Sequence, residues 1–267
     1  MSNDTYEKVL SITDLTMSYG GKQVLKGIDL EVIKGEIIGY IGPNGAGKST
    51  TVKIMLGLIE GYRGKIEIFG QDIAKGDHAY KRKIGYVPEN ADVYDNLTAC
   101  EYLSFTGELY GLDQKHAEQK AFKLMKEFGL EYVFHNRISS YSKGMKQRVL
   151  IISSLLHDPD LLFLDEPLSG LDANSMMIIK EMLSLLAAKG KTIFYSSHIM
   201  DVVEKISSRI ILLAEGKIVA DGSFEELKMQ NKEGTLEEIF NQLTGFNEHK
   251  SIAESIVATV NEVQPNG

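Results

Sequence analysis

A glycine-rich segment with the sequence GPNGAGKSTT has the residue types that handle phosphate groups. From Gly42 to Ser49 it fits the pattern of Gly, four residues, Gly, Lys and then Ser or Thr, and it follows an apolar run at 36–41. Glycines let backbone amides turn toward phosphate oxygens, the lysine reaches the β- and γ-phosphates, and the hydroxyl binds Mg²⁺. The alternative is an ordinary glycine-rich turn between a strand and a helix. We predict a nucleotide-phosphate site formed by Gly42, Pro43, Asn44, Gly45, Ala46, Gly47, Lys48, Ser49 and Thr50.

Two adjacent acids end the apolar run LLFLDEP at 161–167. Acids at the end of a core strand are costly to bury unless a cation faces them, and beside a phosphate site that cation is Mg²⁺. We expect Asp165 to be the metal-side acid. Glu166 is expected to point elsewhere and to orient or deprotonate the water that attacks the γ-phosphate. The alternative is a pair of surface acids between a strand and a loop.

One histidine, His198, ends another apolar run, TIFYSSH. A single histidine at a strand end is often structural. Here it is expected at the same carboxyl edge of a parallel sheet as the phosphate site, where ligands bind. We therefore predict that His198 contacts the γ-phosphate, because an imidazole can donate a hydrogen bond to an oxyanion.

A second segment suited to an anion is ISSYSKGMKQRVL at 138–150. Its first half has the composition of a loop and its second half that of a helix. A hydroxyl on Ser142 and the amide of Gly144 at a helix start would suit an anion. The alternative, a plain serine cap on a helix, is compatible with that role.

Apolar runs of strand length recur along the chain, bounded by glycine and other turn residues. Two or three strands are expected within 9–41, ending in a buried strand at 36–41. Further strands are expected at 64–70, 83–88, 160–167, 191–198 and 209–222, the last segment being a hairpin around Glu215 and Gly216. Strands that alternate with helices indicate a mostly parallel α/β sheet.

Helical patterns occupy most of the remaining chain. We expect a helix at 48–58 and an inserted helical block at 91–158. A further helix at 172–190 is predicted to end at Gly190 and to turn inward Ile178, Ile179, Met182, Leu183 and Leu186. Residues 245–267 have weak patterning, and we expect a loosely attached tail.

The bulk composition is that of an ordinary globular chain: 267 residues, of which 43% are hydrophobic and 25% charged. The net charge of −8 argues against nucleic acid as a partner, because such binders are more often basic. The single cysteine, Cys100, cannot form an internal disulfide, which fits a reducing compartment. Neither a signal-peptide pattern nor an apolar run long enough to span a membrane is evident in the sequence.

Five segments together resemble the ATP-binding cassette (ABC) ATPases: GPNGAGKST, YSKGM, LLFLDEP, SGLD and SSH occur in that family's order and spacing. The resemblance covers about residues 8–222. It implies an α/β fold: a P-loop NTPase core with a mostly parallel sheet, an N-terminal antiparallel β subdomain and an inserted helical subdomain. It places the nucleotide-binding core with its β subdomain at 1–90 and 159–222, the helical signature subdomain at 91–158, and a C-terminal helical extension and tail at 223–267.

The resemblance also implies roles for residues outside the phosphate motif. In that family two cassettes pair head to tail, and the signature loop of each covers the γ-phosphate held by the other. Ser142 and Gly144 would then face the partner's ATP, and Asp172 in SGLD would lie across the dimer interface, although Asp172 can also be a helix cap. Tyr19 stands where the family stacks an aromatic ring on adenine, and its alternative is an ordinary strand tyrosine.

Two motifs depart from the common family pattern. Tyr141, Lys143 and Met145 replace Leu, Gly and Gln of the usual signature Leu-Ser-Gly-Gly-Gln. Glu89 stands where the family usually has a Gln that contacts Mg²⁺ and the attacking water. A carboxylate can bind Mg²⁺ or accept from water but cannot donate, so the detailed role of Glu89 stays open. Both variants resemble ATPase subunits of ABC-2-type export systems.

The resemblance thus implies an ATP- and Mg²⁺-dependent ATPase subunit that powers transport, with export favoured. Its partners would be integral-membrane permease subunits and a second cassette, either identical or related, and it would lie in the cytoplasm at the inner face of the membrane. The alternative is a soluble non-transport ABC ATPase of the repair, chromosome or translation type. The segment between Lys48 and Ser142 is too short for the long coiled coil of the repair and chromosome types, and the single cassette differs from the translation type. An ordinary P-loop kinase would not explain the signature or His198.

Overall fold

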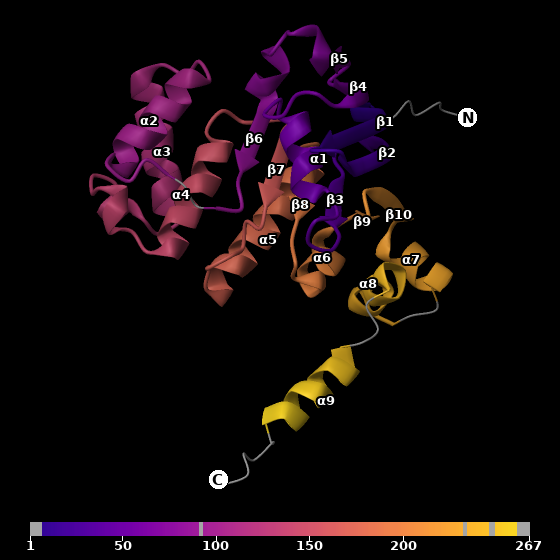
Figure 1. Ribbon diagram of the computed structural model, residues 1–267. Helices are drawn as coiled ribbons and strands as arrows, with labels where there is room; N and C mark the ends of the chain where they lie inside the picture. Colours follow the sequence, from indigo (N-terminus) through magenta and orange to yellow (C-terminus); the bar gives the residue numbers. More distant parts are fainter. Residues whose placement is uncertain (1–6, 91–92, 232–233, 246–248, 261–267) are drawn as a thin grey trace.

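The computed structural model describes residues 7–90, 93–231, 234–245 and 249–260, and its elements surround two β-sheets (Figure 1). The larger sheet has the strand order β10-β9-β3-β8-β7-β6. Its strands run parallel except for β10, which pairs antiparallel with β9 at one edge. The mostly parallel α/β sheet is therefore confirmed. Its strands are β3 (Ile37–Ile41), β6 (Ile84–Val87), β7 (Leu161–Asp165), β8 (Thr192–Ser196), β9 (Arg209–Ala214) and β10 (Lys217–Gly222).

The smaller sheet is antiparallel and has the strand order β2-β1-β4-β5. Together with β3, its first two strands account for the two or three strands expected within 9–41. Its strands are β1 (Lys8–Tyr19), β2 (Lys22–Ile33), β4 (Arg63–Ile68) and β5 (Gln71–Asp72).

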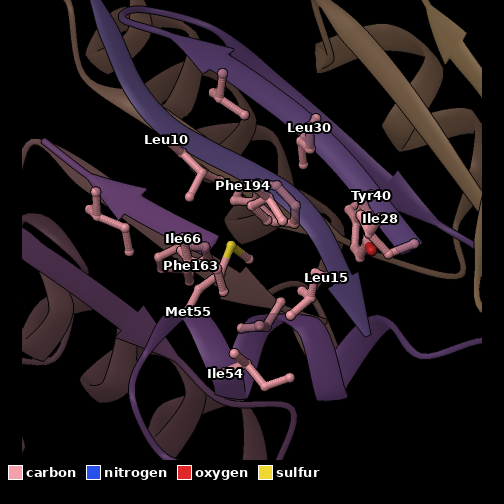
Figure 2. Packing of buried hydrophobic residues seen from close by; sticks show 14 of the residues in the cluster. Leu10, Leu15, Ile28, Leu30, Tyr40, Ile54, Met55, Ile66, Phe163 and Phe194 are labelled. Atoms are coloured by element: carbon pink, nitrogen blue, oxygen red, sulfur yellow. The ribbon is translucent and has the colours of Figure 1, made fainter. Parts of the chain in front are cut away.

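The two sheets share a hydrophobic core, which Figure 2 shows from close by. Tyr40, Phe163 and Phe194 from the parallel sheet pack together, with ring centroids 4.8 Å apart for Tyr40–Phe194 and 5.5 Å apart for Phe163–Phe194. Leu15 and Ile28 of the antiparallel sheet are fully buried in the same cluster. Since both faces of β3 are covered, all five of its residues are buried, as in other parallel sheets. This rigid centre positions the loops at the carboxyl ends of β3, β7 and β8.

Helices cover the parallel sheet, and a group of them lies beyond one of its edges. Figure 1 shows α2, α3 and α4 grouped beyond the β6 edge, where they have a hydrophobic core of their own. The helices are α1 (Lys48–Met55), α2 (Ala99–Leu109), α3 (Gln114–Glu127), α4 (Lys143–Leu155), α5 (Ala173–Ala188), α6 (Met200–Ile206), α7 (Phe224–Asn231), α8 (Leu236–Thr244) and α9 (His249–Val260). Short 3₁₀ turns lie at Ile73–Lys75, Ala79–Lys83, Glu131–Val133 and Ile138–Ser140.

Two details of the helix predictions are wrong. Ile178 of α5 is 59% exposed, whereas Ile179 and Leu183 are buried and Met182 and Leu186 pack against the core. At about 100° per residue, Ile178 lies beside this apolar stripe rather than in it. Helix α1 ends at Met55 and not at residue 58, because the chain turns at Gly57 with a φ of 64°.

Other turn predictions are confirmed. Glu215 and Gly216 have φ values of 49° and 80°, as the tight turn between β9 and β10 requires. After α5, Gly190 adopts the left-handed conformation that ends the helix, with a φ of 84°.

The C-terminal region contains α7 and α8 beside β10 and β9, and α9 beyond them. Figure 1 shows α9 standing apart from the other elements, and the loosely attached tail expected for 245–267 stays a prediction. Residues 246–248 and 261–267 of that tail lie outside the described part of the chain. None of the helices in the described ranges has the length and apolar character needed to span a membrane.

Candidate nucleotide-binding and hydrolysis site

The loop between β3 and α1 has the backbone shape of a phosphate cradle. Gly45 and Gly47 have φ values of 79° and 111°, which side-chain-bearing residues rarely adopt. A Cβ on Gly47 would lie 2.5 Å from Leu25 Cδ2, and one on Gly42 would lie 2.2 Å from the Leu213 carbonyl oxygen. The loop leads directly into the N-terminus of α1, whose first amides have no acceptor within the helix. This end of the helix therefore suits an anion.

Lys48 lies across the loop that precedes it. Its Nζ donates to the carbonyl oxygens of Gly42 at 2.6 Å and Pro43 at 3.1 Å, so the amine is held by the backbone and not by a carboxylate. Burial lowers the pKa of Lys48, and the nearby charges of Asp165, Glu166 and Glu89 oppose that shift. A phosphate group in the loop would supply a negative counter-charge and so stabilise the buried ammonium group. The lysine therefore fits a nucleotide phosphate.

The two acids after β7 are held by different partners. Asp165 pairs in register with Ser196 of β8, whose hydroxyl donates to Asp165 Oδ1. The Glu166 amide donates to the Ser196 carbonyl at 3.0 Å, and Glu166 itself has a φ of 48°. Its Oε2 accepts from the Ser197 hydroxyl at 3.2 Å, and its Oε1 lies 3.5 Å from His198 Nε2. The two carboxylates therefore have separate surroundings, as the sequence predicted.

The surroundings of Glu166 suit a general base. Burial raises the pKa of its carboxyl group, while His198 and the Ser197 hydroxyl act in the opposite direction. A raised pKa makes a carboxylate a better proton acceptor near neutral pH. The His198 side chain is 56% exposed, whereas that of Glu166 is only 14% exposed.

A cavity of about 640 Å³ brings most of the predicted residues together. Tyr19 and Glu89 line it, as do Asp165, Glu166 and His198. So do residues of the phosphate loop and the start of α1: Pro43, Asn44, Gly45, Ala46, Gly47, Lys48, Ser49 and Thr50. Gly42 is not among these lining residues, and its carbonyl oxygen accepts a hydrogen bond from Lys48 Nζ. The cavity therefore joins residues from both sheets.

Tyr19 forms one wall of the cavity at the end of β1. The residue is 45% exposed, and it pairs with Lys22 across the β1–β2 hairpin. An exposed ring at the cavity mouth can stack on a base. Stacking of Tyr19 on adenine therefore stays a prediction.

The sequence did not predict several of the residues that line the cavity: Lys22, Gln23, Val24, Lys26 and Glu215. The tight Gly20–Gly21 turn could have placed Lys22 beside Tyr19. Glu215 has no local signal, because the β9–β10 turn reaches the cavity only through its contact with β2. There the Lys26 amide donates to the Gly216 carbonyl at 2.9 Å.

The residues predicted to bind Mg²⁺ have suitable donor atoms. Ser49, Asp165 and Glu89 line the same cavity and offer a hydroxyl and two carboxylates. The described part of the chain contains no cluster of three or more His, Cys, Asp or Glu side chains that could hold a metal alone. Mg²⁺ is usually bound by one or two carboxylates together with substrate phosphates. The donor set therefore fits Mg²⁺ bound together with a nucleotide.

Ser142, Gly144 and Asp172 do not line the cavity. The Ser142 hydroxyl caps α4 by accepting from the Met145 amide at 3.3 Å. Asp172 caps α5 by accepting from the amide and hydroxyl of Ser175 at 3.0 and 2.6 Å. The cap interpretations are therefore confirmed for both residues, and any further role remains a prediction.

Gly144 has a reason within its own chain to lack a side chain. A Cβ there would lie 2.7 Å from the Gly170 carbonyl oxygen. The Gly144 backbone therefore closely approaches the loop that follows the two acids, and its contact with a partner's phosphate stays a prediction.

Comparisons with known proteins agree on one family. Residues 25–169, more than half of the chain, match the family described as ABC transporter. The linearmycin resistance ATP-binding protein LnrL of Bacillus subtilis is 36% identical over 255 residues, which cover 96% of this chain and 81% of LnrL.

Two solved structures extend the similarity to the fold. An ATP-binding subunit of an ABC transporter superposes with a TM-score of 0.83 and 35% identity, covering 88% of this chain and 99% of the other. The ATP-binding cassette MJ0796, in a dimeric post-hydrolysis state bound to ADP and Pi, gives a TM-score of 0.73 and 25% identity. That match covers 80% of this chain and 98% of MJ0796.

Proposed function

The chain belongs to the ABC transporter family as an ATP-hydrolysing subunit, and we propose that it couples Mg²⁺-dependent ATP hydrolysis to export through separate membrane subunits. The observation that carries this proposal is the convergence of Lys48, Asp165, Glu166 and His198 on one cavity. Asp165 ends β7 and Glu166 follows it, while the histidine follows β8 and the lysine begins α1. Such convergence indicates a catalytic site more strongly than any single motif does.

In this proposal, binding of the nucleotide depends on three features of the cavity. The ring of Tyr19 stacks on adenine at the mouth. The amides of 43–50 and the amine of Lys48 surround the phosphates, and the N-terminus of α1 adds partial positive charge. Ser49, Asp165 and Glu89 would hold Mg²⁺, which would neutralise part of the phosphate charge when bound.

The hydrolytic step falls to Glu166 and His198. The Glu166 carboxylate takes a proton from the attacking water, because burial has raised its pKa toward the working range. His198 is half-exposed beside it and can donate to the γ-phosphate oxygens. In the described structure these two side chains lie 3.5 Å apart, so one can orient the other.

A second cassette completes each site in the proposed mechanism. Ser142 and Asp172 are exposed and lie outside the chain's own cavity. Their position supports a contact between the signature loop of each chain and the ATP held by its partner. Gly144 belongs to the same loop. The cassette MJ0796, which this chain resembles, was solved as a dimer bound to ADP and Pi. ATP would then favour the closed dimer and hydrolysis would reopen it.

The domain roles follow from the same proposal. Residues 1–90 and 159–222 form the nucleotide-binding core, 91–158 the helical signature subdomain and 223–267 a C-terminal extension. Integral-membrane permease subunits bind the cassettes at the inner face of the membrane, so the chain is cytoplasmic and peripheral. Resistance in the name of LnrL supports export, and the net charge of −8 supports a protein that does not bind nucleic acid.

The experiment that tests this function has two parts. The purified chain should hydrolyse ATP, and EDTA should abolish the activity. Expressed with candidate integral-membrane subunits, it should co-purify with one of them and show altered ATPase activity when that complex is in lipid. ATP hydrolysis without any effect of a membrane subunit would favour the non-transport alternative, and no Mg²⁺-dependent hydrolysis would contradict the proposed enzyme.

A further inference from the structure

Two consecutive serines at the end of β8 each bind one of the two acids at the end of β7. Ser196 donates to Asp165, and Ser197 donates to Glu166 Oε2 at 3.2 Å. Both serines are nearly inaccessible, with relative exposures of 3% and 2%. Polar groups buried this deeply are costly unless they are hydrogen-bonded, so the two pairs are constrained by their surroundings.

The backbone explains why Glu166 needs such a partner. β7 and β8 are paired in register to Asp165 and Ser196, and the Glu166 amide adds one more bond to the Ser196 carbonyl. The chain then leaves the strand, because Glu166 has a φ of 48°. The direction of its side chain is therefore not set by the regular alternation of a strand. Hydrogen bonds to the carboxylate, and not strand geometry, therefore fix its position.

The hydroxyl of Ser197 has a defined orientation. Its Oγ accepts a hydrogen bond from the Ile199 amide at 3.1 Å. That bond occupies a lone pair, which leaves the hydroxyl proton free to point at Glu166 Oε2. Ser197 is therefore a donor toward the carboxylate.

His198 provides a looser contact on the other carboxylate oxygen. Its Nε2 lies 3.5 Å from Glu166 Oε1, and its side chain is 56% exposed. Because Ser197 is buried and bonded on both sides, it constrains the carboxylate more firmly than His198 does. Oε2 is thus held, and Oε1 is the oxygen nearer the histidine.

We propose that Ser197 is a positioning residue, which holds Glu166 Oε2 so that Oε1 accepts the proton of the attacking water. This inference rests on the proposed role of Glu166 as the general base. A proton of the water passes to Oε1 as the water oxygen bonds to the γ-phosphorus. The bond from that phosphorus to the β,γ-bridging oxygen breaks, and ADP leaves. Ser197 takes no proton and touches no substrate.

A change at Ser197 should alter the geometry of the base. The Ser197 hydroxyl is the donor that holds Glu166 Oε2. Ser197→Ala removes that donor and leaves the carboxylate free to turn, so Oε1 faces the attacking water less often. The loss should therefore fall on kcat and not on the binding of ATP.

The test compares three variants by steady-state ATPase kinetics, with kcat and KM determined separately. Ser197→Ala should lower kcat roughly tenfold, less than the 10²–10⁴-fold that loss of a general base itself costs. The KM for ATP should change little, since the phosphate loop is untouched. Ser197→Thr keeps the hydroxyl and should restore kcat. Ser196→Ala loses a hydroxyl at the same strand end but should change the Mg²⁺ requirement, because its partner is Asp165.

Several outcomes would overturn the proposal. One is wild-type kcat in Ser197→Ala. Another is a lower kcat that Ser197→Thr does not restore, or one accompanied by an equal loss of ATP binding, either of which would indicate a structural role only. Circular dichroism and ATP binding verify that each variant is folded; if Ser197→Thr does not fold, the comparison of kcat with KM in Ser197→Ala decides alone.

Glu166→Gln, measured beside these variants, separates this proposal from the proposed function. If Glu166→Gln hydrolyses ATP normally, the assignment of the base is wrong, and Ser197 then has no base to position. If Glu166→Gln is inactive while Ser197→Ala equals wild type, only the positioning role fails.

Discussion

The phosphate-loop cavity and the signature segment at 138–150 differ in how far one chain completes them. In the cavity, residues from β1, the β3–α1 loop, β7 and β8 converge on a common volume of about 640 Å³. In the signature segment, the serine hydroxyl is used as the cap of α4. The residues of the cavity therefore converge within a single chain. The signature segment, beyond capping α4, can contact a nucleotide only if a second molecule supplies it.

The signature segment is nevertheless connected to the hydrolytic acids of its own chain. Gln147 of α4 is buried and donates to the Pro167 carbonyl at 3.2 Å, and Lys143 Nζ lies 3.3 Å from Ser169 Oγ. Gly144 packs against the Gly170 carbonyl. The start of α4 thus lies on the loop that directly follows Glu166. A substitution at Gly144 would disturb both the signature segment and the loop after Glu166. Ser142 is therefore the better position for changing the signature segment alone.

The largest expected effect is on the cavity alone. Lys48→Ala should abolish productive binding of ATP with Mg²⁺, because no other side chain reaches the same place from the loop. The fold should persist, since the amine bonds only to two carbonyls of its own loop. ATPase turnover and nucleotide titration measure the effect. Lys53→Ala, on the exposed side of the same helix, is the matched control and should retain activity; normal turnover in Lys48→Ala would break the comparison.

The second prediction joins the two regions. Glu166→Gln should bind ATP but hydrolyse it about 10²–10⁴-fold more slowly, because it lacks the general base. The γ-phosphate then persists, and the signature segment of a second chain should clamp it. Size-exclusion chromatography should show a dimer with ATP and a monomer with ADP.

Adding Ser142→Arg to Glu166→Gln tests the signature side directly. A bulky group at the start of α4 should prevent dimerisation while leaving ATP binding intact, because the chain's own cavity is unchanged. Losing the cap costs about 0.5–2 kcal/mol of stability, so Ser142→Ala in the same background is the control for that loss. If the arginine variant dimerises as well as Glu166→Gln alone, the segment does not face the partner's ATP.

A smaller effect is expected at the cavity mouth. Tyr19→Ala should weaken ATP binding several-fold, since stacking adds about 0.5–1.5 kcal/mol beyond area burial. Tyr19→Phe keeps the ring and should bind nearly as well as wild type. GTP should be accepted too, because a ring recognises the face of the base. Equal affinities for all three proteins in nucleotide titrations would return Tyr19 to an ordinary strand tyrosine.

The smallest effect concerns Glu89, which lines the cavity from the loop after β6. If it only binds Mg²⁺ or accepts from water, Glu89→Gln should retain most ATPase activity, because an amide oxygen can do the same. Glu89→Ala should lose more and need more Mg²⁺. A collapse of turnover in Glu89→Gln would show that the charge itself takes part in the reaction.

Much of the cavity was predictable because its signals are local in the sequence. The spacing of Gly42, Lys48 and Ser49 after an apolar strand identifies a phosphate loop wherever it is found. The same holds for acids at the end of an apolar run and for two left-handed residues in a tight hairpin. The order of the five motifs then identified the family, which the comparisons confirmed.

What the sequence by itself determined was therefore the type of each element and the chemistry of each motif, because both depend on neighbouring residues. Tertiary structure alone decided that Ile178 falls outside the buried stripe of α5 and that Glu215 reaches the cavity through β2. It also decided that Gly144 has no room beside Gly170 and that Ser197 holds Glu166. Each of these facts depends on the distance between segments far apart in the chain. Such distances are set by how sheets and helices pack, and no local pattern of residues records them.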